Sequence, residues 1–167
     1  MAGRFAGSHI PDPGFAGDDG AVPTAVAEAM RAFAADRSTR PEALTALQAS
    51  RLLVPVVAVL GEVEHDEQGL VHDKSSDMAT VLVRGADGRL ALLAFTGSEP
   101  MTRWNPEARP VPVTAGDAAR AALAEGAEAL VVDLAGPVPL AVEGDDLRGL
   151  AEGWTLARVG DRTAWVR

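Results

Sequence analysis

The feature that most constrains the fold is a pair of apolar runs, 79–83 and 90–95, separated by a short polar turn. The turn contains Asp87-Gly88, and Asp-Gly between two strand-like runs is among the strongest sequence signals of a β-hairpin. Both runs are rich in Val, Leu or Phe, which favours strands in the middle of a sheet. We therefore predict a hairpin around which the rest of the chain folds.

Further elements are predicted on both sides of this hairpin from apolar periodicity and from capping residues. Helices are expected at 23–36, about 41–49, 98–104, about 115–125 and a short stretch that ends at Gly153. Strands are expected at 52–60, 109–113, 129–134 and 139–142, with a terminal hairpin of 154–159 and 162–166. Pro55 predicts that the first strand lies at a sheet edge or a bulge, because proline cannot donate to a ladder. Thr114 is expected to cap its helix and Gly126 to end it. This order predicts an α+β fold with a mixed, mostly antiparallel sheet and helices packed against it.

The chain has 167 residues, for which one domain is the default. Residues 1–20 are predicted to form an N-terminal arm, because proline and glycine oppose regular structure there and aspartates keep the segment solvated. Residues 21–153 are predicted to form the α+β domain. Residues 154–167 are predicted to form a C-terminal hairpin extension of the same domain.

Charge limits the classes of partner. The formal net charge is -9, and the chain has no cysteine. A negative charge disfavours nucleic acid and anionic membrane surfaces as partners, since both need positive charge to replace counterions. No signal peptide and no apolar run long enough for a membrane helix is evident. A cytoplasmic protein is therefore expected, with no disulfide framework.

Several motifs together resemble one family. They are the segment 73–83, the run 92–96 with Trp104, the segment 126–133 followed by Gly136-Pro137, and the arm segment 15–20. Over about residues 10–150 the chain resembles the SseB N-terminal domain family in its actinobacterial form. The resemblance implies an α+β domain of cytoplasmic bacterial proteins and brings no catalytic residues with it.

The densest polar group beside the predicted strands is Lys74, Ser75, Ser76 and Asp77. A nucleophilic serine needs an adjacent base, and a phosphate loop needs glycines ahead of its Lys-Ser; neither pattern is present. The favoured interpretation is a loop whose polar side chains satisfy backbone groups at the strand ends. The alternative is a recognition surface for a protein or small ligand, since function concentrates in loops on a rigid scaffold.

Other polar and aromatic groups also have alternative interpretations. His65 and His72 match no recognised zinc spacing, so no metal and no cofactor is expected. Arg103 and Trp104 could form a binding hot spot, or Trp104 could fasten its short helix onto the sheet. Trp154 and Trp165 in the terminal hairpin could cover the sheet, or two copies of the chain could meet there as a homodimer.

No catalytic set is assembled in this sequence, so the preferred hypothesis is a non-enzymatic module that binds another protein. Its candidate interaction residues are Lys74, Ser75, Ser76, Asp77, Arg103 and Trp104. The alternative is a sensor of small molecules or peptides with a pocket beneath the loop 73–77. A serine hydrolase that uses Ser75 or Ser76 ranks last.

Overall fold

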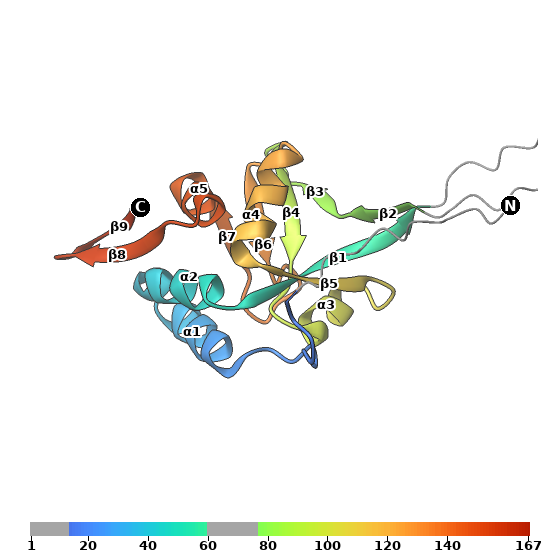
Figure 1. Ribbon diagram of the computed structural model, residues 1–167, viewed down its shortest axis with the longest axis horizontal. Coiled ribbons are helices and arrows are strands. Elements are labelled where there is room, and N and C mark those ends of the chain that lie inside the picture. Colours follow the sequence, from blue (N-terminus) through green and yellow to red (C-terminus); the bar gives the residue numbers. More distant parts are fainter. Residues whose placement is uncertain (1–13, 60–76) are drawn as a thin grey trace, which may run out of the picture.

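The computed structural model describes residues 14–59 and 77–167 and combines helices with short strands (Figure 1). The helices are α1 (Thr24–Ala35), the one-turn 3-10 helix η1 (Arg37–Thr39), α2 (Arg40–Gln48), α3 (Ser98–Trp104), α4 (Ala115–Ala124) and α5 (Gly144–Glu152). The strands are β1 (Arg51–Val59), β2 (Asp77–Thr80), β3 (Leu82–Arg84), β4 (Leu90–Ala94), β5 (Arg109–Thr114), β6 (Ala129–Val132), β7 (Leu140–Glu143), β8 (Thr155–Val159) and β9 (Arg162–Val166).

Most strand pairs are antiparallel. One sheet has the order β2-β1-β5, a second has the order β3-β4-β6-β7, and β8 pairs with β9. In the described residues the only parallel pair is β4 with β6. Leu53 and Phe95 join the first two sheets through two backbone hydrogen bonds of 2.8 Å. The predicted α+β fold with a mixed, mostly antiparallel sheet is confirmed.

The central strand β4 is buried on both faces. Its side chains alternate, as strand geometry requires. Leu92 and Ala94 belong to a large core that α1, α2, α4 and α5 also supply. Leu93 and the following Phe95 belong to a smaller core beneath α3, where the rings of Phe95 and Trp104 lie 5.6 Å apart. Helices therefore cover both faces of the second sheet around its parallel pair.

The predicted central hairpin is present, but its first run is divided between two sheets. β3 pairs with β4, and the turn between them includes Gly88 with a φ of 83°. Residues 77–80 instead pair with β1, so the run changes partners near Val81. β3 lies at the edge of its sheet, and the prediction that both runs lie in the middle was wrong for the first run.

Pro55 does not mark a sheet edge, because β1 is the middle strand of its sheet. The residue lies between Leu53, which bonds to Phe95, and Val56, where the pairing with β2 begins. It faces Pro110 on β5. A proline is tolerated here because β1 exchanges one neighbour for another at this position and no ladder donor is needed.

The caps predicted for α4 are confirmed. Thr114 Oγ1 accepts a hydrogen bond of 3.0 Å from the backbone N–H of Asp117. Gly126 has a φ of 72°, in the left-handed region where glycine carries no steric penalty. The two residues bound a helix whose small alanine side chains allow close packing on the sheet.

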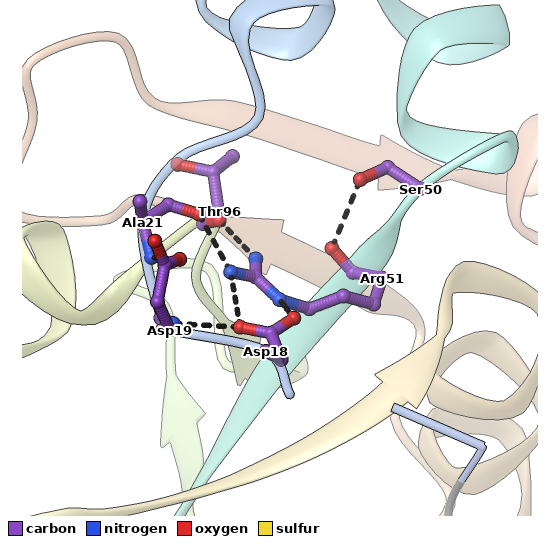
Figure 2. Close-up of polar contacts among 7 residues, drawn as sticks. Asp18, Asp19, Ala21, Ser50, Arg51 and Thr96 are labelled. Atoms are coloured by element: carbon purple, nitrogen blue, oxygen red, sulfur yellow. Dashed lines mark hydrogen bonds and ion pairs between the residues drawn. The ribbon is translucent and has the colours of Figure 1, made fainter. Parts of the chain in front are cut away.

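The described part of the arm is held by Arg51, the first residue of β1, which is only 6% exposed. Its Nε and Nη2 donate to the two carboxylate oxygens of Asp18 at 2.5 and 3.0 Å (Figure 2). The guanidinium also donates to the carbonyls of Thr96 at 2.5 Å and Ala21 at 2.6 Å. The hydrogen bonds that Asp18 accepts from the Arg51 side chain lower the pKa of its carboxyl group. The arm is therefore tied to the segment between β4 and α3.

The terminal hairpin β8–β9 extends from the body next to α2 and α5 (Figure 1). The indole N–H of Trp165 donates to Asp146 Oδ1 at 2.9 Å, and Gln48 Nε2 donates to the carbonyl of Trp154 at 2.6 Å. Gly149 on α5 lies directly beneath the Trp165 ring. The hairpin is thus docked on helices and pairs with neither larger sheet.

Candidate ligand-binding pocket

The parallel strands β4 and β6 end at the same edge of the sheet, and a polar residue follows each of them. Thr96 comes two residues after β4, and Asp133 directly follows β6. Asp133 Oδ1 accepts from the backbone N–H of Thr96 at 2.9 Å, and Oδ2 accepts from its hydroxyl at 2.7 Å. Both residues are buried, with exposed fractions of 2% and 3%. The pair therefore fastens the two strand ends together.

Asp133 adopts an uncommon backbone conformation. Its φ is 53°, the one positive value among the non-glycine residues that the structure describes. Aspartate is among the few residues that accept this conformation at modest cost. The carbonyl of Asp133 then accepts from the N–H of Gly136 at 2.8 Å, which closes the turn toward β7. Such backbone outliers cluster at functional sites, and a pocket lies above this edge of the sheet.

A pocket of about 270 Å³ opens over the Thr96–Asp133 pair. Ala27, Met30 and Arg31 of α1 line one part of it. α3 contributes Glu99, Pro100 and Arg103, and the remaining lining comes from Val22, Thr96, Asp133, Pro137 and Val138. Ligand crevices in sheets with parallel strands form outside the carboxyl ends of those strands, which is where this pocket lies.

The charged groups of the pocket differ in how they are paired. Arg103 Nη2 lies 3.0 Å from Glu99 Oε1 in an exposed i,i+4 pair on α3. Arg31 is exposed, and its side chain has no hydrogen-bond or ion-pair partner among residues 14–59 and 77–167. Burial raises the pKa of Asp133, while its hydrogen bonds with Thr96 and the positive charge of Arg103 act in the opposite direction. The pocket thus presents an unpaired cation above a buried carboxyl group.

Replacing Asp133 with Asn tests this ionisation. Between the raised pKa of Asp133 and its ordinary value of 3.8, the folded protein binds a proton that the unfolded chain lacks. As pH falls through that window, Asp133 therefore adds stability to the wild type, and Asn cannot. We expect the free energy of unfolding of Asp133→Asn to fall relative to that of wild type as pH is lowered from neutrality toward 3.8. Urea unfolding at each pH measures it, and a constant difference would contradict the raised pKa.

The family model for the SseB protein N-terminal domain matches residues 26–149. This chain belongs to the SseB N-terminal domain family. The resemblance seen in the sequence is thereby confirmed. No curated protein and no solved structure showed a significant match. The matched range of the SseB domain contains ten of the eleven pocket-lining residues, all except Val22, and it ends before the hairpin β8–β9.

Three of the predicted interaction residues, Lys74, Ser75 and Ser76, lie outside the described residues of the SseB domain, as does the predicted pocket beneath their loop. Asp77 begins β2 and pairs with Val59 of β1. His65 and His72 also lie in the segment that is not described. The interaction role of this loop therefore stays a prediction.

The other two predicted residues are neighbours on α3 with different surroundings. Arg103 lines the pocket of the SseB domain. Trp104 is half-buried and packs on Phe95, which agrees with the interpretation that it fastens α3 onto the sheet. Sequence reasoning missed Arg31, Thr96 and Asp133 as site residues. The sequence signal for Thr96 and Asp133 was that each polar residue closely follows a buried strand, β4 or β6.

Two further properties concern the described parts of the SseB domain. In residues 14–59 and 77–167, no helix combines the length and the apolar character needed to cross a membrane. Across the same ranges, no group of three or more His, Cys, Asp or Glu side chains is placed to hold a metal ion.

Proposed function

We propose that this SseB-family domain is a non-enzymatic binding module that recognises another protein through the pocket between α1 and α3. The observation that carries the proposal is the make-up of this pocket. Its lining is mostly apolar, and Arg31 stands unpaired among the described residues. A mostly apolar cavity with a few placed polar groups is the usual form of a binding site.

The floor of the pocket supports binding rather than bond-making. Thr96 and Asp133 are at most 3% exposed, and both carboxylate oxygens of Asp133 already accept hydrogen bonds from Thr96. A general base must reach the proton that it abstracts, and these groups are occupied with each other. Their arrangement suits a rigid support that holds the strand ends and the pocket wall in place.

A matched pair of substitutions on α1 tests the proposal. Ala27 lines the pocket, whereas Ala25 on the same helix is exposed. Ala27→Leu would fill part of the cavity, and Ala25→Leu makes the same chemical change outside it. We expect affinity capture followed by quantitative mass spectrometry to recover a partner with wild type and Ala25→Leu, and at least ~10-fold less with Ala27→Leu, a loss of about 1.4 kcal/mol. Equal recovery with all three proteins would contradict a role for this pocket.

The pocket volume favours a second candidate, a sensor of small molecules. About 270 Å³ is close to the lower limit of roughly 300 Å³ for small-molecule sites. A ligand that binds only the native state raises the melting temperature. A metabolite that stabilises wild type and Ala25→Leu, but not Ala27→Leu, would favour the sensor over the protein-binding module.

A further inference from the structure

The charges around the pocket define the kind of ligand that it can accept. Arg31 and Arg103 come from two different helices, and the acidic groups are Glu99 and Asp133. The Arg103–Glu99 pair is exposed, with Glu99 84% accessible, so it contributes little and Arg103 can turn toward a ligand. Both carboxylate oxygens of Asp133 point to Thr96. Arg31 is thus the charged group with which an anionic ligand would most directly form an ion pair.

The balance of these charges favours an anion with a single negative charge. The lining contains two arginines, one exposed carboxylate and one buried carboxyl group. The pocket therefore has a small net charge, and a doubly charged phosphate would be poorly compensated in it. A carboxylate matches the planar guanidinium through two parallel hydrogen bonds.

The apolar lining residues indicate the chemistry of the part of the ligand that does not carry the charge. Ala27, Met30, Pro100 and Val138 present apolar atoms to the cavity. Burial of aliphatic carbon there would be favourable, whereas a polar group would lose hydrogen bonds to water without replacement. At about 270 Å³ the cavity is large enough for an aliphatic group of a few carbons.

We propose that this pocket binds a monocarboxylate that carries a short aliphatic group, with Arg31 as the main contact for the carboxylate. The free C-terminus of a protein that ends in an aliphatic residue supplies this chemistry, and so does a short branched-chain acid. The inference rests on the proposed function, because it names the ligand class of the same pocket.

Isothermal titration calorimetry with four probes tests the ligand class. Isovalerate and a short peptide with a free C-terminal leucine carry the carboxylate. Isovaleramide and the same peptide with an amidated C-terminus keep the shape and lose the charge. We expect at least one of the two acids to bind, and each neutral counterpart to bind at least ~10-fold more weakly, since a hydrogen bond to a charged group contributes at least this much.

Two arginine variants provide the matched control. Arg31→Ala removes the proposed contact, and Arg148→Ala removes another exposed arginine, on α5, whose partner is Asp145 at 3.4 Å. We expect Arg31→Ala to weaken binding of the acid at least ~10-fold and Arg148→Ala to leave it unchanged. Both residues are on the surface, so neither variant is expected to unfold.

Each outcome decides the inference. Binding of the peptide in preference to isovalerate supports a protein C-terminus, and the reverse supports a small acid. Binding of neither acid, equal binding of the amides, or wild-type affinity in Arg31→Ala would overturn the carboxylate assignment. If Ala27→Leu still abolishes partner capture in that case, the proposed function stands and only the ligand class is wrong.

Discussion

Replacement of Asp18 with Ala is expected to lower the free energy of unfolding by about 2 kcal/mol, because the buried Arg51 guanidinium loses its charged hydrogen-bond partner. The Arg51 side chain is 5% exposed, whereas Asp18 lies at the surface with 21% of its side chain exposed, so the cost falls on the buried guanidinium and water partly screens the pair. Without the carboxylate, the guanidinium keeps, within the described part of the chain, only the carbonyls of Thr96 and Ala21 as acceptors. A buried charge without a counter-charge is the dominant cost.

The effect should extend from the arm to the pocket. The carbonyl of Gly20 accepts a hydrogen bond of 2.8 Å from the backbone N–H of Ser98 at the start of α3. Val22, just beyond this contact, lines the pocket. Loss of the Asp18 anchor would therefore loosen one wall of the pocket, and Asp18→Ala should weaken ligand binding as well as stability.

The neighbouring aspartate supplies the control for this prediction. Asp19→Ala removes the same charge and one exposed hydrogen bond to the N–H of Ala21. We expect this control to change stability by at most about 1 kcal/mol. Asp18→Ala should lower the melting temperature by roughly 6 °C for a chain of this size, measured by thermal and urea unfolding. Similar melting temperatures for the two variants would contradict the proposed importance of the Arg51–Asp18 pair.

The pH dependence gives a second check with a defined sign. The pKa of Asp18 is lowered in the folded protein by its hydrogen bonds with Arg51. The stability from this pair is therefore present above 3.8, the ordinary value, and is lost as pH falls below it toward the lowered pKa. The difference in stability between wild type and Asp18→Ala should shrink in that acidic range and remain constant above it.

Local sequence signals predicted the elements well because each is encoded within a few residues. Thr114 and Gly126 bound α4 as expected, and the Asp87-Gly88 turn joins β3 to β4. The same signals failed where the outcome depends on distant partners. Pro55 indicated a sheet edge or a bulge, yet β1 is the middle strand of its sheet and changes neighbours at that residue.

The candidate site could be predicted only in part. Arg103 was identified from its own neighbourhood in the sequence, and it does line the pocket. The other polar contributors, Arg31, Thr96 and Asp133, come from three separate segments. They meet because β4 and β6 run parallel and end together, and strand direction is not encoded within either strand. A site that depends on such long-range strand pairing can be located only once the three-dimensional fold is known.

The second large effect concerns the terminal hairpin, which packs on α5 at Gly149. Gly149→Ala is expected to lower the free energy of unfolding by about 2 kcal/mol, a typical cost of overpacking. A Cβ at this position would lie 2.2 Å from Cδ2 and 2.6 Å from Cε2 of the Trp165 ring. Contacts at these distances cannot persist, so the indole and its strand must shift. The shift would also disturb the hydrogen bond from the Trp165 indole N–H to Asp146.

A double variant separates this steric cost from the opposite effect of helix propensity. Alanine is favoured over glycine inside a helix by about 1 kcal/mol, so Gly149→Ala should stabilise α5 once the ring is absent. We therefore expect Gly149→Ala to destabilise the wild type and to stabilise a Trp165→Ala background. Urea unfolding measures both free energies. A red shift of tryptophan emission with faster proteolysis of residues 154–167 would show that the hairpin has separated from α5.

Because the hairpin lies away from the lining of the α1–α3 pocket, ligand binding there should stay unchanged. The same sign of effect in both backgrounds would show that the Trp165 ring does not restrict this position.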